Sequence, residues 1–265
     1  MGKFDGILLC TDFDHTLAIK AVVSQENADA IRYFQENGGR FTVVSGRNPF
    51  FLKEHIEGFA VNAPLVGYNG ALIIDETTDE ILFSGGRNDL DAFDLVEAAW
   101  EKEPTMWSVT PHDASLFVGR CSRTLGAEGA VADMATLRAL LTKRPLYNVI
   151  CSFKAEEDAI AVKERLAEAA GDKFIVIRSW ATGVEVINPW DQKGAAALRL
   201  KELLGAKLLV CAGDFENDIS MIEAADIGYA VENALPSVKA AADRVTVSCE
   251  QHAIAAIIRE LDETL

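Results

Sequence analysis

The sequence lacks a long hydrophobic segment, and positive charge is scarce. The apolar run near the N-terminus, residues 7 to 10, is far shorter than the ~18 residues that a membrane-spanning helix needs. Twenty-five lysines and arginines stand against 41 aspartates and glutamates, which gives a formal net charge of −16. A protein of that charge repels nucleic acid and anionic lipid. We therefore expect no nucleic-acid partner, no membrane partner and no anchor.

Cysteine and histidine are also scarce. The five cysteines lie far apart, no two have the spacing of a zinc site, and an odd number fits a disulfide framework poorly. The four histidines are equally scattered, and the sequence contains no Walker-type phosphate loop, dinucleotide-binding fingerprint or nucleophile-elbow serine. These absences favour a cytoplasmic protein and argue against the common zinc, nucleotide-binding and serine-hydrolase sites.

Short apolar runs alternate with helical patterns in both end regions of the chain. Residues 6 to 11 and 41 to 45 have the composition of buried parallel strands, and residues 24 to 37 between them have helical periodicity. After residue 191 the alternation resumes with a side-chain-capped helix that ends at Gly205, followed by strands at 207 to 211, 227 to 230 and 245 to 247. This alternation predicts an α/β fold with a doubly wound, mostly parallel, Rossmann-like sheet.

The middle of the chain has a different pattern. A hairpin over residues 71 to 83 departs from the parallel arrangement and marks an insertion point. Two helices and several strands are then expected, the helices at 131 to 141 and 156 to 169, and the strands at 106 to 109, 115 to 118, 147 to 153, 174 to 177 and 184 to 187. We therefore predict a discontinuous catalytic core, residues 1–83 and 188–265, with an inserted α+β cap, residues 84–187.

Two aspartates follow the first predicted strand. Asp12 and Asp14 are separated by Phe13, so their side chains point to the same side of an extended chain. Ligands of open α/β sheets bind at the carboxyl ends of the strands, which is where this pair lies. Taken alone, however, the pair also fits a capped turn, in which Asp and Thr are common.

Three further segments place polar residues at the end of a strand or the start of a helix. Ser45 ends the second strand, ahead of a helix that begins at Asn48-Pro49; Lys193 begins the helix that returns to the core; and residues 213 to 218 follow another strand. Each segment alone is explained equally well by a turn, a surface lysine or a helix cap. Their occurrence together, each at the expected end of an element, indicates a functional site.

The five ordered segments resemble the Cof-type phosphatases of the haloacid dehalogenase (HAD) superfamily, which carry a large α+β (C2-type) cap. The segments are Asp12-x-Asp14-x-Thr16-Leu17, Ser45-Gly46-Arg47, Asn69-Gly70-Ala71, Lys193-Gly194, and Gly213-Asp214-x-x-Asn217-Asp218 with Met221. The resemblance implies a Mg²⁺-dependent phosphoric monoester hydrolase. Its substrate would be a small phosphorylated metabolite, such as a sugar phosphate, selected by the cap, and the reaction would pass through an aspartyl phosphate on Asp12.

The resemblance also implies a role for each residue. Asp12 would be the nucleophile, and Asp14 the general acid and base. Phosphate would be held by Ser45, Gly46, Lys193 and Asn217, and Mg²⁺ by Asp12, the Asp14 backbone carbonyl, Asp214 and Asp218. A hard cation of this kind relieves the repulsion among clustered carboxylates. The candidate substrate contacts are His15, which stands where the family most often has glycine, Arg47 and Asn69.

Two alternative functions share these residues. A phosphomutase of the HAD type uses the same two aspartates but rebinds its intermediate. A non-catalytic regulatory module would bind a phosphorylated ligand without turnover, although such a module would be expected to lose at least one of the charged positions. The sequence does not distinguish a phosphomutase or a regulatory module from a phosphatase, and it predicts neither the substrate nor the oligomeric state.

Overall fold

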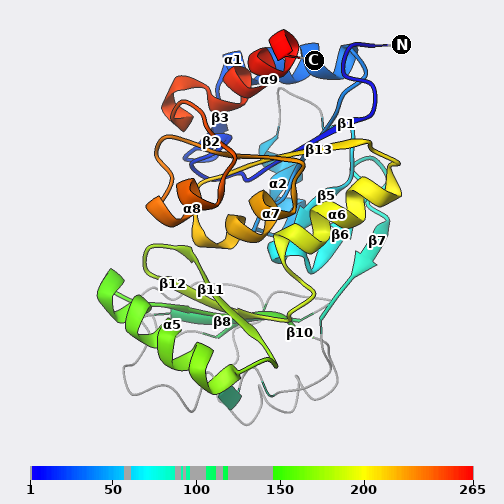
Figure 1. Cartoon of the computed structure of the whole chain (residues 1–265). Helices are drawn as coiled ribbons and strands as arrows, with labels where there is room; N and C mark the ends of the chain where they lie inside the picture. Colours follow the sequence, from blue (N-terminus) through cyan, green and yellow to red (C-terminus); the bar gives the residue numbers. More distant parts are fainter. Residues whose placement is uncertain are drawn as a thin grey trace. The chain divides into compact units, whose positions relative to one another are not determined.

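The computed structural model describes residues 2–56, 61–86, 91, 94–95, 106–111, 116–118 and 146–264. The chain divides into two compact units, which are Met1–Phe83 with Gln192–Leu265 and Ser84–Asp191 (Figure 1). The second unit thus extends a few residues beyond the predicted cap boundary at residue 187. The helix predicted at 131 to 141 lies outside the described residues.

A five-stranded parallel sheet forms the centre of the first unit. Its strand order is β15 (Arg244–Val245), β14 (Ile227–Ala230), β13 (Leu208–Gly213), β1 (Ile7–Thr11) and β4 (Arg40–Val43). Every residue of β1 is buried, as the continuous apolar run predicts for a central parallel strand. Thr11 is in register with Ala212 of β13 and with Val43 of β4, so the carboxyl ends of these three strands meet at one edge.

Helices cover both faces of this sheet. Figure 1 shows α1 (Gln25–Glu36) and α9 (Ala253–Thr264) on one side of it, with α6 (Lys193–Leu203), α7 (Ile219–Ala224) and α8 (Pro236–Ala241) on the other. Leu8 and Cys10 of β1 pack with Ala196, Ala197 and Leu200 of α6 in one buried cluster. The predicted doubly wound α/β fold is therefore confirmed, and Cys10 serves as a small core residue.

Capping residues explain where two of the helices begin. At the start of α1, the Ser24 side chain accepts a hydrogen bond from the Asn27 backbone amide. Helix α2 (Pro49–His55) is capped by Asn48 and begins at Pro49, as predicted. The expected side-chain cap of α6 is wrong, because Gln192 makes no capping hydrogen bond. The Asp191 carboxylate instead accepts from the Gly86 amide at 2.9 Å and from Asn188 Nδ2 at 2.8 Å, which ties together the two ends of the second unit.

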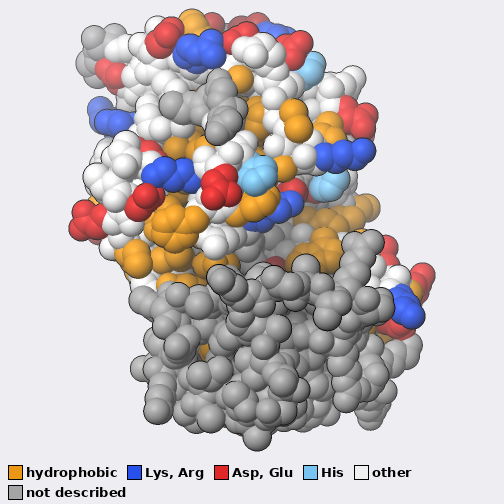
Figure 2. Space-filling view, turned by 180° about the vertical axis from the view of Figure 1, so that it is seen from behind, with side chains coloured by type: hydrophobic (Ala, Val, Ile, Leu, Met, Phe, Trp, Pro, Cys, Tyr) orange, Lys and Arg blue, Asp and Glu red, His pale blue; other side chains and the backbone are white. Residues whose placement is uncertain are grey.

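Two small antiparallel elements complete the first unit. The predicted hairpin is present as β6 (Leu72–Ile74) and β7 (Ile81–Ser84), which join β5 (Leu65–Gly67) in a three-stranded sheet. A hairpin that the sequence did not predict, β2 (Ala18–Ile19) with β3 (Val22–Val23), follows directly after the two aspartates. On the face drawn in Figure 2, acidic, basic and hydrophobic side chains of this unit are interspersed, so the negative net charge forms no single acidic region there.

The second unit contains an antiparallel five-stranded sheet and one described helix. The strand order is β11 (Ile175–Trp180), β12 (Gly183–Ile187), β10 (Leu146–Ser152), β8 (Met106–Pro111) and β9 (Leu116–Val118). Helix α5 (Glu156–Ala170) packs against β11 and β12, and buried Arg178 donates to Glu156 Oε1 at 2.8 Å. The insertion is therefore an α+β unit. None of the helices in the described part of the chain has the length and apolarity that crossing a membrane would require.

Candidate active site

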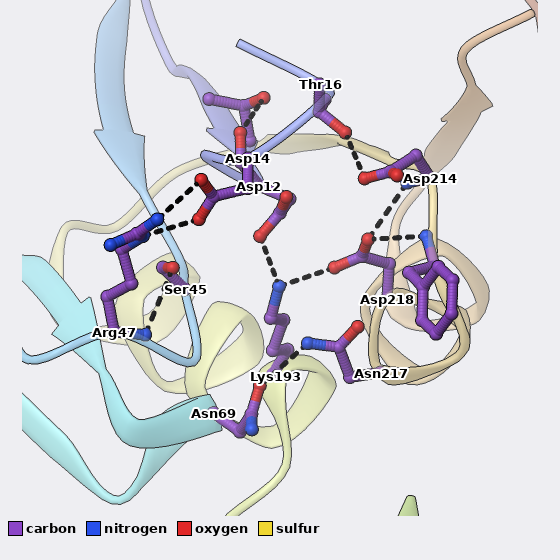
Figure 3. Close-up of polar contacts among 12 residues, drawn as sticks. Asp12, Asp14, Thr16, Ser45, Arg47, Asn69, Lys193, Asp214, Asn217 and Asp218 are labelled. Carbon is purple, nitrogen blue, oxygen red and sulfur yellow. Dashed lines mark hydrogen bonds and ion pairs between the residues drawn. The ribbon is translucent and has the colours of Figure 1, made fainter. Parts of the chain in front are cut away.

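The predicted site residues of the first unit gather at the carboxyl edge of its parallel sheet (Figure 3). Asp12 directly follows β1, and its backbone amide extends the ladder by donating to the Ala212 carbonyl at 2.9 Å. Asp214 directly follows β13, and Asp218 ends the short 3₁₀ turn Glu216–Asp218. Lys193 is the first residue of α6. Parallel pairing of β1 with β13 is thus what brings residues 12 and 214 together.

A buried lysine links two of the carboxylates. Lys193 Nζ lies 2.5 Å from Asp12 Oδ1 and 2.6 Å from Asp218 Oδ1, and the lysine is 1% exposed. Burial alone lowers the pKa of Lys193, but the negative charges of Asp12 and Asp218 outweigh it and raise the pKa above its usual range. Lys193 is therefore a fixed cation at the centre of the site.

Three carboxylates surround this lysine with more negative charge than it can balance. Asp12, Asp214 and Asp218 each offer one carboxylate oxygen, and these oxygens all lie within 4.8 Å of one another. Burial raises the pKa of Asp12 well above its usual value and that of Asp214 to about 7, with neighbouring carboxylates adding to both effects. An all-oxygen, anionic donor set of this kind fits a hard divalent cation such as Mg²⁺.

Hydrogen bonds hold the acidic segment in place. Asp218 Oδ2 accepts from the backbone amides of Asp214 at 2.9 Å and Phe215 at 3.0 Å, and Thr16 Oγ1 donates to Asp214 Oδ1 at 2.9 Å. A Cβ atom on Gly213 would lie 2.4 Å from the Asp218 Cβ atom, a separation that packed atoms do not tolerate. Glycine at position 213 is therefore required by the close approach of Asp218.

Asp14 is held apart from this cluster. Both of its carboxylate oxygens accept from Arg47, Oδ2 from Nε at 2.5 Å and Oδ1 from an Nη atom at 2.8 Å. The side chains of Asp14 and Arg47 are 36% and 39% exposed, so a ligand can reach both. Arg47, predicted as a substrate contact, is therefore primarily the partner of Asp14 in this structure.

The remaining phosphate-binding candidates form a hydrogen-bonded group around Asn69. Asn217 Nδ2 donates a hydrogen bond to Asn69 Oδ1 at 3.0 Å, and the Asn69 backbone amide donates one to the Ser45 carbonyl at 2.9 Å. Ser45 Oγ accepts from the Arg47 amide at 3.2 Å. A Cβ atom on Gly46 would lie 3.3 Å from the Asn69 side-chain amide. Asn69 adopts a left-handed backbone conformation, φ 56°, which asparagine tolerates better than most residues.

His15 also has a left-handed backbone, with φ 61°. Glycine adopts such a conformation without steric cost, so the glycine that the family resemblance implies at this position would fit the same backbone. The His15 amide donates to the Ala18 carbonyl at 2.8 Å, and Asn233 Nδ2 donates to the His15 carbonyl at 2.9 Å. Sequence analysis missed Asn233, which has no recognisable motif, and a substrate contact by His15 remains a prediction.

The raised pKa of Asp214 predicts a pH-dependent effect of Asp214→Asn on stability. The usual value is 3.8 and the folded value about 7, so at pH 4 and below the carboxyl group is largely neutral in the folded protein. As the pH rises from 4 to 7, the unfolded chain releases this proton more readily than the folded one, and the folded state loses stability. In metal-free protein, we expect Asp214→Asn to raise the unfolding free energy by roughly 1 to 4 kcal/mol at pH 8 and hardly at pH 4.

Thermal and urea unfolding in the presence of a chelator would measure this difference. Asparagine can still accept the bond from Thr16, so packing is preserved. An equal change in stability at both pH values would contradict the prediction.

Comparison with known proteins identifies the family. The acidic cluster lies at the carboxyl edge of the parallel sheet, which is where open α/β sheets bind their ligands. A family model described as haloacid dehalogenase-like hydrolase matches residues 9–258. The chain therefore belongs to the haloacid dehalogenase-like hydrolases, which confirms the predicted family.

Two relatives that match nearly the whole chain have phosphatase names, and these names give different substrates. The 5-amino-6-(5-phospho-D-ribitylamino)uracil phosphatase YcsE of Bacillus subtilis is 26% identical over 95% of this chain and 94% of its own. The HMP-PP phosphatase of Klebsiella pneumoniae is also 26% identical, over 94% of this chain and 90% of its own. A solved haloacid dehalogenase-like hydrolase from B. subtilis has a TM-score of 0.79 at 24% identity, covering 96% of this chain and 99% of that one. The two phosphatase names support the predicted enzyme class, a phosphoric monoester hydrolase, and the solved structure supports the fold.

Proposed function

We propose that this protein is a Mg²⁺-dependent phosphatase that transfers a phosphoryl group from a small phosphorylated metabolite to Asp12 and then to water. The observation that carries the proposal is the Asp12 carboxylate, which is buried, lies 2.5 Å from Lys193 Nζ and shares its surroundings with Asp214 and Asp218. The phosphatase names of relatives that match nearly the whole chain support the same reaction.

The charges of the site suit attack by a carboxylate on a phosphate dianion. Two anions repel, so a site for this reaction must supply positive charge. Lys193 supplies one cation, and Mg²⁺ held by Asp12, Asp214, Asp218 and the Asp14 backbone carbonyl would supply the rest. Ser45 Oγ, the Gly46 backbone amide and the Asn217 amide are proposed to bind the oxygens of the transferring group, with Asn69 orienting Asn217.

Two steps complete the proposed reaction. An Asp12 carboxylate oxygen forms a bond to phosphorus while the ester bond breaks, and the Asp14 carboxyl group gives its proton to the leaving oxygen. A water molecule then attacks the phosphorus of the aspartyl phosphate and gives a proton to Asp14, while the bond between phosphorus and the Asp12 oxygen breaks. Inorganic phosphate leaves, and both aspartates return to their starting forms.

The second unit is proposed to select the substrate as the inserted cap. Two relatives with the same identity to this chain are named for different phosphate compounds, so neither substrate is carried over. Sugar phosphates remain the proposed class. The four cysteines among the described residues are buried thiols outside any disulfide, which agrees with action in the reducing cytoplasm.

A phosphate-release assay tests the proposal. With Mg²⁺, purified protein should release inorganic phosphate from p-nitrophenyl phosphate, acetyl phosphate and at least one sugar phosphate, and chelation with EDTA should remove the activity until Mg²⁺ is restored. An isomerised sugar phosphate without phosphate release would identify a phosphomutase. Binding of a phosphorylated compound without any turnover would instead identify a regulatory module, and both outcomes would reject the phosphatase proposal.

A further inference from the structure

We infer that Arg47 is a positioning residue that holds the Asp14 carboxyl group in one orientation and thereby aims its proton at the leaving oxygen. This inference rests on the proposed phosphatase reaction and assigns Arg47 a role in one part of it, the departure of the alcohol. Predicted from sequence as a substrate contact, Arg47 would instead act through Asp14.

The contact between the two side chains fixes orientation as well as distance. Arg47 donates from Nε to one oxygen of Asp14 at 2.5 Å and from an Nη atom to the other at 2.8 Å. A single hydrogen bond would leave the carboxylate free to rotate, whereas two parallel bonds from a planar guanidinium fix its plane. Within the described part of the chain, Arg47 is the side chain to which Asp14 bonds.

Arg47 is itself held on two sides. Its guanidinium carbon lies 4.5 Å from the centroid of the Phe51 ring, and that ring stacks on His55 with centroids 3.8 Å apart and planes 21° apart. At the backbone, the Arg47 amide donates to Ser45 Oγ and its carbonyl accepts from the Tyr68 amide at 3.0 Å. Helix α2 thus carries an aromatic support for the guanidinium.

The position of Asp14 needs such a restraint. Asp14 is two residues from Asp12 in the chain, and the carboxylates of Asp12, Asp214 and Asp218 form the proposed cation site. An unrestrained carboxylate beside that site would be drawn toward the cation and away from the leaving oxygen. Because a displacement of about 1 Å can cost roughly 10²-fold in rate, loss of the arginine should weaken proton donation strongly.

A series of substituted phenyl phosphates separates this role from substrate binding. The esters share the phosphoryl group and nearly the same shape, but their phenols differ in basicity, so only the need for a proton changes. For Arg47→Met, we expect kcat/KM to fall about 10²-fold for phenyl phosphate and no more than about 3-fold for 2,4-dinitrophenyl phosphate. Arg47→Lys, which keeps a charge but loses the two-pronged contact, should give an intermediate dependence on leaving-group basicity.

Three further variants make the result interpretable. In Asp14→Asn, kcat/KM should depend on the basicity of the leaving phenol as steeply as in Arg47→Met. Combining the two substitutions should make that dependence no steeper. Phe51→Leu, which removes the aromatic support alone, should have a smaller effect in the same direction. Arg40→Met is the matched control, because Arg40 is exposed at the other end of β4 and donates to the Asn62 carbonyl.

The possible results have distinct meanings. An equal loss of activity for all esters in Arg47→Met would show that Arg47 binds the shared phosphoryl group, and it would overturn the inference while leaving the phosphatase function intact. Equal melting temperatures of wild type and Arg47→Lys would show that the lysine variant reports on chemistry rather than folding. A wild-type protein that hydrolyses none of the esters would reject the proposed function and the inference with it.

Discussion

Replacing Asp12 by asparagine is expected to abolish phosphatase turnover, with a loss of ~10⁴-fold or more in kcat. Asparagine has nearly the same shape and can still accept a hydrogen bond from Lys193 through its Oδ1 atom. It cannot attack phosphorus as a carboxylate does, so no aspartyl phosphate can form at residue 12. Rates with p-nitrophenyl phosphate would measure the loss, and acid-quenched protein examined by mass spectrometry would show the phosphorylated enzyme in wild type alone.

The substitution Asp29→Asn is the matched control for the loss of one negative charge. Asp29 is exposed on α1 and binds Gln25 and Arg32 on the same helix, so Asp29→Asn should leave kcat unchanged. Wild-type rates in Asp12→Asn would remove Asp12 from the role of nucleophile, whatever the fate of the other assignments. Mass spectrometry after long incubation would check that asparagine 12 has not deamidated to aspartate.

Lys193→Met should have the second largest effect, and it should reduce both stability and activity. The lysine ammonium is fully buried between Asp12 and Asp218, so its removal leaves buried carboxylates without their cation. Breaking a buried ion pair on one side typically costs about 3 to 5 kcal/mol. Loss of a preorganised charge at a reacting phosphoryl group should lower kcat by a further 10²- to 10³-fold, roughly.

The response of Lys193→Met to Mg²⁺ separates its loss of stability from its loss of activity. Urea unfolding without Mg²⁺ should show the full loss of stability, and Mg²⁺ should restore part of it because the cation relieves the same repulsion. Activity should remain low even where the variant is folded. Lys201→Met is the control on the same helix: Lys201 binds Asp226 at the surface, and such a pair contributes about 1 kcal/mol or less. Wild-type stability of metal-free Lys193→Met would refute the proposed charge balance.

The sequence by itself was sufficient for the order of the main strands and helices of the first unit, although not for the hairpin of β2 and β3. Hydrophobic and capping patterns are local, so the strand predicted at residues 6 to 11, observed as Ile7–Thr11, and the capped start of α2 at Asn48-Pro49 could be assigned without tertiary information. The parallel arrangement followed from the alternation of strands and helices, and it placed Asp12 and Asp214 at one edge. The family was predictable for the same reason, because its motifs lie at the ends of these elements.

Only the tertiary structure decided which side chains meet. Lys193 is 181 residues from Asp12 and 25 from Asp218, yet it binds both, and Arg47 is 33 residues from the aspartate that it holds. No local pattern encodes such pairs, because they depend on strand register and on how a helix lies across the sheet. The sequence determined that carboxylates gather at the end of β1; the packing of α6 and α2 decided that Asp12 faces a lysine and Asp14 an arginine.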